Sequence, residues 1–467
     1  MKGIIVAGLG GGSGKSVVAV GLVAHYAGQG KVVLPFKKGP DYIDAGWLSL
    51  AAGRSCFNLD PYLMERHDLL ASFRARAAQG DLIIVEGNRG LYDGVDAHGG
   101  YSTAELAKLL DMPVLLVVDC TKTTRTVAAL VLGCKKLDPE VKISGVVLNR
   151  IGSARHEAIV REAVETYAGL PVVGAFRRAK RDIFPMRHLG VTPFQEYDGA
   201  GEAIAELARA AERSLDMAAV DRLMVSLDFG VQEPKPTQAV RAAVKVGVLR
   251  DAAFQFYYPE NLRALAVEGA EVVEIDSLRA AVLPADLDAL YIGGGFPETS
   301  ASLLAANTRF RASVKAAAES GLPIYAECGG LIYLGESIRL ADEDFPLVGI
   351  FPVRFSLEER PQAHGYTILR ALPNNPFYRP GTLIKGHEFR YSRVAAWSGE
   401  PASLALEMER GVGFMEGRDG LVYKNVLALY THIHAVATRE WAPALVAKAR
   451  EFAAQQGGSR DMSVLSG

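Results

Sequence analysis

Short, unbroken runs of apolar residues alternate with helical patterns in the first half of the chain. The runs cover residues 3–8, 32–36, 82–85, 114–118 and 143–148. They do not alternate with polar residues, and such runs are typical of strands in a parallel sheet that is covered on both faces. Between them lie segments rich in Ala and Leu with helical spacing, such as residues 105–110 and 126–137. The alternation predicts a doubly wound α/β domain over residues 1–230.

The pattern breaks at residues 230–237, GVQEPKPT, which combine glycine, proline and polar residues without periodicity. A second series of apolar runs follows, at residues 245–249, 271–275, 289–292, 323–326 and 426–430. We therefore predict a linker over residues 231–243 and a second doubly wound α/β domain over residues 244–455. Residues 456–467 contain several Gly and Ser residues, and we expect them to form a flexible tail.

Composition narrows the class of protein without changing this fold. Of the 467 residues, 49% are hydrophobic and 22% are charged, which is enough apolar material for large cores. The net charge of −2 gives no general attraction to nucleic acid or to an anionic membrane. The four cysteines lie far apart without a CxxC pair, which argues against a disulfide framework and a thiolate zinc site. Neither a signal peptide nor an apolar span of roughly 20 residues is found, so we expect a cytoplasmic protein.

A glycine-rich loop joins the first predicted strand to a helix. Its glycines allow backbone N–H groups to converge on phosphate oxygens at the helix N-terminus. In such loops the lysine reaches the β- and γ-phosphates and the hydroxyl binds Mg²⁺. The spacing here is G-x5-GK[ST], one residue longer than usual, because Leu9 stands where a glycine is expected. The predicted phosphate-binding residues of the loop are Gly8, Gly10, Gly11, Gly12, Ser13, Gly14, Lys15 and Ser16.

Charged residues follow the next predicted strands. Lys37, Asp41 and Asp44 come just after the second strand, and Glu86 ends the third. The carboxyl ends of parallel strands face the ligand crevice. A lysine for phosphate charge and carboxylates for Mg²⁺ are what phosphoryl transfer requires, so the set predicts that chemistry. Asn149, at the end of a later strand, suits either the reading of a base edge or a turn.

The second half carries the residues of a cysteine nucleophile. Cys328 lies in PIYAECGGLIYL, between a predicted strand and a helix, where the helix N-terminus favours the thiolate. The string GGGFPE follows an earlier strand, and the N–H groups of Gly294, Gly295 and Gly329 are suited to form an oxyanion hole. His432 and His434 follow the last strand, where a general base could reach the thiol.

Several strings of the first half resemble the synthetase half of cobyrinic acid a,c-diamide synthases. They are PFKKGPDYID, SCFNLD, EGNRGLYDG, VVLNR and PMRHLG. The loop is also similar to that of dethiobiotin synthetase, which has the same extra residue and activates a carboxylate with ATP. The resemblance implies that ATP is bound and that Lys15, Ser16, Lys37, Asp41 and Glu86 serve its phosphates and Mg²⁺. It further implies that Asn149 serves adenine and that Asp44, Asp93 and Arg187 line the substrate cleft.

The second half resembles class I glutamine amidotransferases of the cobyric and cobyrinic acid type. The matching strings are DAAFQFYYPENL, YIGGGFPE, YAECGGL, GHEFRYS and YKNVLALYTHIH. The resemblance implies that Cys328 attacks L-glutamine, releases ammonia and leaves a glutamyl thioester. Many relatives outside this branch carry His-Pro-Glu as base and orienter. Aligned on that triplet, His432 takes the place of the base and His434 that of the missing carboxylate, so His432 is the preferred base and His434 the alternative.

The combined resemblance implies an ATP- and glutamine-dependent amidation through an acyl phosphate. The substrate of the family is cobyrinate, which is amidated on its c and a acetate side chains. Members usually read EGVMGLYDG, whereas this chain has Asn88 and Arg89 in the middle of that string, and Arg390 stands where His is common. Both arginines are suited to pair with tetrapyrrole carboxylates. Sirohydrochlorin, its metal complexes and hydrogenobyrinate therefore stay alternative substrates.

Two other classes of protein fit less well. A P-loop switch ATPase would carry a second lysine at the position of Gly10 and would leave Cys328 unexplained. A non-catalytic tetrapyrrole-binding protein would not need both Lys15 and Cys328. The sequence leaves the oligomeric state open, with a homodimer among the options.

Overall fold

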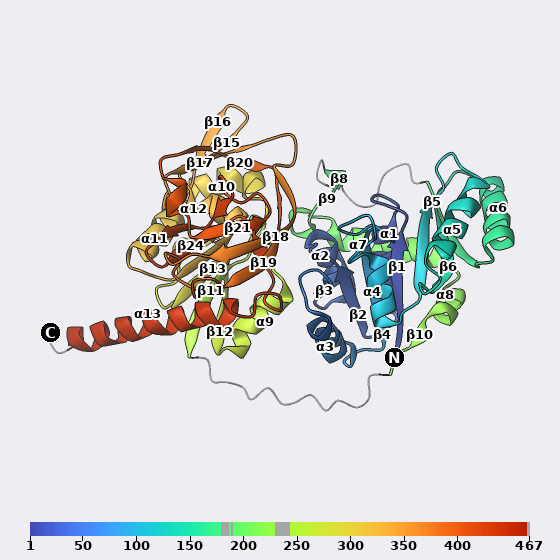
Figure 1. Cartoon of the computed structure of the whole chain (residues 1–467), viewed down its shortest axis with the longest axis horizontal. Helices are drawn as coiled ribbons and strands as arrows, with labels where there is room; N and C mark the ends of the chain where they lie inside the picture. The colour runs from blue at the N-terminus through green and yellow to red at the C-terminus, as the bar shows by residue number, and fades with distance from the viewer. Residues whose placement is uncertain (179–185, 188–189, 229–242, 465–467) are drawn as a thin grey trace. The chain divides into compact units, whose positions relative to one another are not determined.

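The chain folds into two compact units, Met1–Lys235 and Pro236–Gly467 (Figure 1). The computed structural model describes residues 1–178, 186–187, 190–228 and 243–464. Each unit is built around a largely parallel β-sheet, so the predicted class of two α/β domains is confirmed. Residues 231–242 of the predicted linker lie outside the described residues.

The first unit is centred on an eight-stranded sheet. The order along the sheet is β3 (Phe57–Leu59), β2 (Val33–Lys38), β4 (Leu82–Gly90), β1 (Lys2–Gly8), β5 (Val114–Asp119), β6 (Ile143–Ile151) and β7 (Val172–Arg177). These strands are parallel to their neighbours, and β10 (Val225–Ser226) pairs antiparallel with the start of β1. A separate pair is formed by β8 (Met186–Arg187) and β9 (Gly190–Val191). The five predicted runs correspond to β1, β2, β4, β5 and β6.

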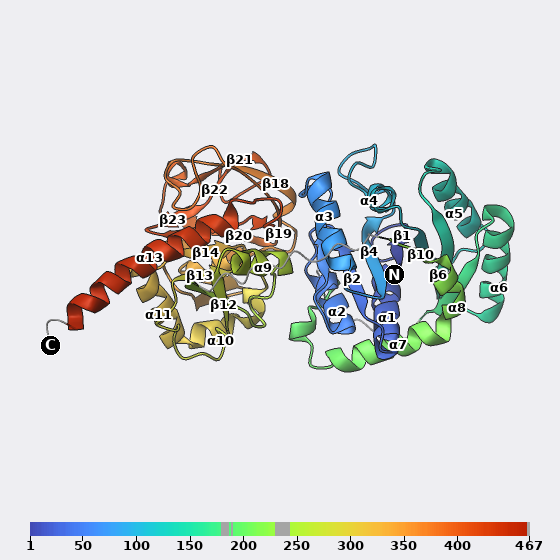
Figure 2. The ribbon, with the colours of Figure 1, turned by 90° about the horizontal axis from the view of Figure 1, so that it is seen from below.

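Helices cover both faces of this sheet (Figure 2). On one face lie α1 (Lys15–Gly28), α2 (Ile43–Ala52) and α7 (Ala200–Ser214), and on the other lie α3 (Arg66–Ala77) and α4 (Thr103–Leu110). The remaining helices are α5 (Thr126–Leu137), α6 (Ala154–Ala163) with a π-helical turn at Val164–Ala168, and α8 (Met217–Leu223). Helix α1 approaches α7 closely because Gly21 has no side chain: an added Cβ would lie 2.9 Å from the Leu207 carbonyl oxygen. This packing buries one face of α1 and fixes its N-terminus at the glycine-rich loop.

The second unit contains three sheets. The largest has the order β12 (Ala270–Ile275), β11 (Val244–Leu249), β13 (Ala289–Ile292), β14 (Ile324–Glu327), β24 (Val426–Leu429) and β23 (Leu421–Tyr423). It is parallel except for β23. The second sheet has the order β16 (Glu343–Pro346), β15 (Ser337–Leu340), β17 (Val353–Leu357) and β20 (Ser392–Trp397). The third has the order β22 (Arg418–Asp419), β21 (Leu406–Arg410), β18 (Ala363–Ala371), β19 (Leu383–Arg390) and β25 (His432–Ile433).

Helices flank the parallel sheet of the second unit as well. Helices α9 (Pro259–Val267) and α13 (Trp441–Val464) lie on one side, and α10 (Ala301–Ala306) and α11 (Thr308–Glu319) on the other (Figure 2). The short α12 (Gly329–Leu334) directly follows Cys328. Helix α13 continues to Val464, into the segment for which the sequence predicted a flexible tail. Within the described ranges, no helix is both long and apolar enough to cross a membrane.

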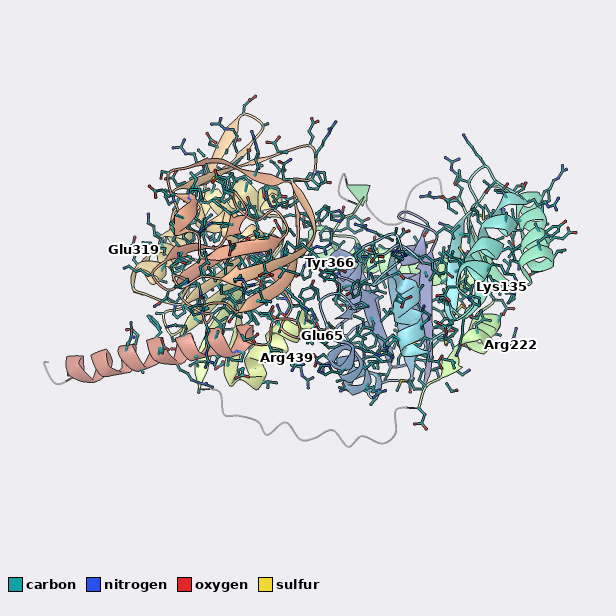
Figure 3. The ribbon with its side chains drawn as sticks, in the orientation of Figure 1. Glu65, Lys135, Arg222, Glu319, Tyr366 and Arg439 are labelled. Carbon is teal, nitrogen blue, oxygen red and sulfur yellow. The ribbon has the colours of Figure 1, made fainter. Side chains whose placement is uncertain are left out.

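Each unit has a hydrophobic core of its own, between its parallel sheet and the helices (Figure 3). In the first unit, Ile4, Val6 and Ile84 of the sheet pack with Val18 and Leu22 of α1. The apolar residues of the strands therefore pack against the helices that cover the sheet. The polar residues that follow these runs lie at the carboxyl edge of the sheet. That edge carries the first candidate site.

Candidate active sites

The glycine-rich loop runs from the end of β1 to the start of α1 and is open on one side. Gly12 and Gly14 have φ values of 73° and 94°, in the left-handed region that glycine tolerates best. Among the described residues, nothing lies within 4 Å of a Cβ added to Gly10, Gly11 or Gly12. Because the first N–H groups of α1 have no partner within the helix, they are available to an anion at this place.

Asn149 supports the loop from β6. Its Nδ2 donates a hydrogen bond to the Ser13 carbonyl oxygen at 2.8 Å. A Cβ added to Gly14 would lie only 2.0 Å from the same Nδ2. Asn149 therefore packs beneath the phosphate loop, and its contact with adenine stays a prediction.

Gly14→Ala should weaken ATP binding. The new Cβ would lie 2.0 Å from Asn149 Nδ2, and the alanine would have to adopt a φ of 94°. The loop must therefore shift. We expect the KM for ATP in ammonia-driven amidation to rise by about tenfold or more, because the loop N–H groups lose their alignment. Gly133→Ala on α5 is the matched control, since its Cβ meets nothing within 4 Å among the described residues. Equal KM values for the two variants would contradict this role of the loop.

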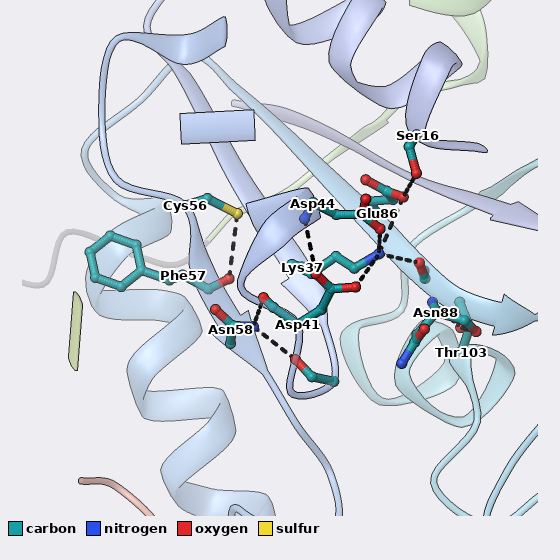
Figure 4. A network of polar contacts seen from close by, with 12 residues as sticks. Ser16, Lys37, Asp41, Asp44, Cys56, Phe57, Asn58, Glu86, Asn88 and Thr103 are labelled. Atoms are coloured by element: carbon teal, nitrogen blue, oxygen red, sulfur yellow. Dashed lines mark hydrogen bonds and ion pairs between the residues drawn. The ribbon is translucent and has the colours of Figure 1, made fainter. Parts of the chain in front are cut away.

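Residues from β2, from the turn into α2, from β4 and from the first turn of α1 meet beside the loop (Figure 4). Strands β2 and β4 are in register at Lys37 and Glu86. The Nζ of Lys37 lies 2.8 Å from Asp44 Oδ2, 3.2 Å from Glu86 Oε1 and 3.8 Å from Asp41 Oδ2. Glu86 Oε1 also accepts a hydrogen bond from Ser16 Oγ at 2.6 Å. The predicted charged residues therefore form one network with the first turn of α1.

The Asp41 loop of this network is held by Asn58 on β3. The Nδ2 of Asn58 donates to the carbonyl oxygens of Gly39, at 2.8 Å, and Asp41, at 2.9 Å. The carboxylate of Asp41 in turn accepts the backbone N–H of Asp44 at 2.9 Å. These bonds explain why both aspartates face Lys37.

Negative charge exceeds positive charge within this network. Burial opposes the charge of Lys37, but Asp44, Glu86 and Asp41 together raise its pKa above the usual range. Burial raises the pKa of Glu86 to about 7, against the effect of Lys37. Burial, followed by the charge of Asp44, raises the pKa of Asp41 to about 6. Carboxylates whose pKa is raised in this way are stabilised by an added cation.

The network fits a Mg²⁺ ion that is shared with nucleotide phosphates. Glu86 Oε2 is buried without a hydrogen-bond partner, and Ser16 Oγ lies against the other oxygen of the same carboxylate. Within the described part of the chain, no three His, Cys, Asp or Glu side chains form a metal cage. Mg²⁺ is commonly held by one or two carboxylates together with waters and substrate phosphates, so a full cage is not required.

In the second unit, Cys328 lies on a strained turn between β14 and α12. Its φ and ψ are 45° and −97°, a conformation that non-glycine residues rarely adopt. A Cβ added to Gly330 would lie 2.5 Å from the Ile292 carbonyl oxygen, so the turn needs glycine there. Cys328 is 7% exposed and lies at the N-terminus of α12. This placement suits an activated nucleophile.

The structure brings His432, and not His434, to Cys328. Burial opposes the charge of His432, but Cys328, through its charge and a side-chain hydrogen bond, and Glu327 raise its pKa to about 10. His434 instead packs on Tyr258, with ring centroids 4.5 Å apart, and its Nδ1 accepts the N–H of Val436. Burial lowers the pKa of His434 to about 3, which keeps it neutral.

The three predicted oxyanion glycines surround the cysteine and the histidine. A Cβ added to Gly329 would lie 3.1 Å from Gly295 N, and one added to Gly294 would lie 2.2 Å from His432 Cε1. The preceding residue, Gly293, donates its N–H to the Tyr257 hydroxyl at 2.8 Å, which anchors the glycine loop. The three positions are thus close enough to serve one reacting carbonyl.

Two residues at this site were missed in the sequence. Glu327 precedes Cys328, and its Oε2 lies 3.5 Å from His432 Nδ1. His387, on β19, stacks on His432 with centroids 5.0 Å apart and is paired with it in register. A charged residue at the end of an apolar strand was the available signal for Glu327. For His387 only the string GHEFRYS was available, without a reason to place it beside the base.

Comparisons with known proteins find relatives of both units. Residues 4–188 match the model of the CobQ/CobB/MinD/ParA nucleotide binding domain, and residues 245–440 match that of the CobB/CobQ-like glutamine amidotransferase domain. The cobyrinate a,c-diamide synthase of Magnetococcus marinus is 41% identical, covering 94% of this chain and 95% of that protein. That of Archaeoglobus fulgidus is 40% identical, covering 96% of this chain and 97% of that protein. That of Methanothermobacter thermautotrophicus is 38% identical, covering 96% of this chain and 100% of that protein.

The chain belongs to the cobyrinate a,c-diamide synthase family. The resemblance described from the sequence motifs is thereby confirmed. The match of residues 4–188 to a nucleotide binding domain also supports the use of a nucleotide by this chain.

Of the candidate substrate residues, Arg390 requires a correction. It is buried, and its guanidinium donates to the carbonyl oxygens of Ser392, at 2.6 Å, and Gly413, at 2.7 Å. The guanidinium carbon also lies 3.8 Å from the ring centroid of Tyr430. These contacts engage Arg390 inside the second unit, so it is not available to a carboxylate of the family substrate.

The other candidates lie in the first unit. Asp93 accepts the N–H of Gly90 at 2.8 Å and so shapes the turn after β4. Arg89 is exposed and has a φ of 51°, while the backbone of Asn88 is bonded to Thr103. Arg187 lies on β8, and its side chain is outside the described residues. Contact of these residues with a substrate stays a prediction.

Proposed function

We propose that this chain uses ATP and L-glutamine to amidate the a and c acetate carboxylates of cobyrinate, a reaction of cobalamin biosynthesis. The observation that carries the proposal is the presence of both sites on one chain. One joins the glycine-rich loop to Ser16, Lys37 and Glu86, and the other joins Cys328 to His432. Relatives that match over nearly their whole length are cobyrinate a,c-diamide synthases.

In the first reaction, a substrate carboxylate attacks the γ-phosphate of ATP, which forms an acyl phosphate and releases ADP. We assign phosphate binding to the loop N–H groups and Lys15, because they lie at the N-terminus of α1. Lys37 holds the carboxylates of Asp44 and Glu86 in place from within the sheet. A Mg²⁺ at Ser16 and Glu86 would neutralise phosphate charge in the transition state.

In the second reaction, the Cys328 thiolate attacks the side-chain amide carbon of glutamine. Backbone N–H groups of the three glycines stabilise the oxyanion. His432 donates its proton to the leaving ammonia and later accepts one from the water that hydrolyses the glutamyl thioester. Ammonia then attacks the acyl phosphate, which forms the amide and releases phosphate.

A substrate panel tests the proposal. The protein is incubated with ATP, Mg²⁺ and glutamine and with cobyrinate, hydrogenobyrinate or sirohydrochlorin, and the amides are counted by mass spectrometry. We expect the diamide of cobyrinate, with the monoamide as an intermediate. Turnover of sirohydrochlorin or hydrogenobyrinate in preference to cobyrinate would overturn the substrate assignment but keep the reaction class.

A further inference from the structure

The glutaminase site has no carboxylate two residues after its base. His434 stands at that place, and burial keeps it neutral. Its Nδ1 accepts the N–H of Val436 and so carries no proton. His434 therefore cannot supply the negative charge that orients and stabilises a protonated base in a catalytic triad.

A carboxylate reaches the base from the opposite direction along the chain. Glu327 Oε2 lies 3.5 Å from Nδ1 of His432, and both side chains are almost completely buried. Because Nδ1 of His432 faces Glu327, Nε2 is the ring nitrogen that is left to face Cys328. Neighbouring residues of a strand normally point to opposite faces. Here the turn at Cys328, with φ 45°, lets Glu327 and Cys328 approach the same imidazole ring.

Other buried groups hold the Glu327 carboxylate. Its Oε1 accepts a hydrogen bond from the Tyr291 hydroxyl at 3.1 Å. Asn261 Nδ2 donates to that hydroxyl at 3.3 Å and to the Ile433 carbonyl oxygen at 3.0 Å. The Oδ1 of Asn261 accepts the N–H of Ala435 at 2.7 Å. The Tyr291 hydroxyl and the Asn261 amide therefore link the Glu327 carboxylate to the strand that carries His432.

The charged groups around His432 favour its protonated form. The titratable groups that face it are Cys328 and Glu327 from the end of β14 and His387 from β19. Burial, followed by His432 and His434, lowers the pKa of His387 well below its usual range, so the stacked ring is neutral. Burial raises the pKa of Glu327, and the nearby charge of His432 opposes that rise.

We propose that Glu327 is the positioning residue of the glutaminase, orienting His432 through Nδ1 in place of the carboxylate that related enzymes carry after the base. The proposal rests on the glutaminase assignment made above and adds a carboxylate to the pair of Cys328 and His432. The order on the chain is then carboxylate, nucleophile and base, with the first two adjacent.

Glu327→Gln keeps the size of the side chain and removes its charge. We expect glutamine-driven amidation to fall roughly 10²–10⁴-fold in kcat, as for triads that lose their carboxylate, with little change in the KM for glutamine. Ammonia-driven amidation should stay at the wild-type rate, because the first site is untouched. Glu260→Gln is the matched control: it alters a buried carboxylate 3.8 Å from His434 Nε2 and should leave both rates unchanged.

A second measurement separates positioning from folding. Alkylation of Cys328 by iodoacetamide reports the reactivity of the thiol beside His432. Loss of the Glu327 charge lowers the pKa of His432, so His432 should keep its proton over a narrower pH range and alkylation at pH 7 should slow by about tenfold or more. Tyr291→Phe, which removes the donor to Oε1 together with the acceptor of Asn261 Nδ2, should shift the same profile in the same direction by a smaller amount.

The outcomes are distinct. If Glu327→Gln retains glutamine-driven turnover and the wild-type alkylation profile, the positioning role is overturned. If the wild-type protein hydrolyses no glutamine, the proposed function fails, and the alkylation profile still decides the pairing of Glu327 with His432. If Glu260→Gln is impaired as strongly as Glu327→Gln, the assignment to Glu327 in particular is wrong.

Discussion

Lys15→Ala is expected to abolish amidation with either nitrogen donor. Lys15 is buried at the first position of α1, and its charge offsets part of the negative charge of Asp44 and Glu86. Without it, only Lys37 would offset these carboxylates beside the phosphates of ATP. We expect a loss of roughly 10³-fold or more in kcat/KM, in line with other groups that stabilise a transferring phosphoryl group. Glutamine-driven and ammonia-driven product formation are measured in parallel.

Lys135→Ala is the control for this variant. Lys135 lies on α5 (Figure 3), where its Nζ donates to the Ala168 carbonyl oxygen at 2.9 Å. Its replacement should leave both reactions near the wild-type rate. If Lys15→Ala keeps more than about a tenth of ammonia-driven activity, the phosphate role of Lys15 is wrong.

Cys328→Ala should separate the two sites. Alanine keeps the Cβ and meets the same strain at φ 45°, so the fold is retained and only the thiol is lost. Glutamine-driven amidation should fall by roughly 10⁴-fold or more, because no thioester forms. Amidation driven by a high concentration of ammonia should continue at the wild-type rate.

Cys134→Ala serves as the control, since Cys134 is a half-buried thiol on α5 in the first unit. Both reactions should proceed normally in it. Glutamine-driven turnover by Cys328→Ala, at a rate similar to that of the control, would rule out Cys328 as the nucleophile.

The parallel sheets were well predicted, and the antiparallel ones were not. Strands such as β1 and β5 are buried on both faces and therefore appear as unbroken apolar runs. Strand β18, which reads AHGYTILRA, has exposed polar positions and an irregular pattern of burial. Strand β3 of the parallel sheet was also missed, since it is only three residues long. Such strands are defined by their partners, and the local sequence does not reveal them.

The candidate sites divide in the same way. Lys37 and Glu86 lie in register on neighbouring parallel strands, so their meeting followed from the topology. Glu327 depends on the strained turn at Cys328, and His387 on the pairing of β19 with β25, two strands far apart in the sequence. Arg390 was assigned to the substrate from its charge alone, and only the structure shows the carbonyl groups that it binds. Contacts that depend on tertiary packing could therefore not be predicted from the sequence.

The chain crosses from one sheet to another between the end of β24 and the start of β25. Cys328 follows a strand of the six-stranded parallel sheet, whereas His432 is paired with β19 of the five-stranded sheet. The nucleophile and its base are thus carried by two different sheets. A displacement of about 1 Å between them would lower the rate of glutamine hydrolysis, because catalysis is sensitive to displacements of that size. The hydrogen bonds from Tyr291 to Glu327 and from Asn261 to Tyr291 and Ile433 therefore hold the separation on which the reaction depends.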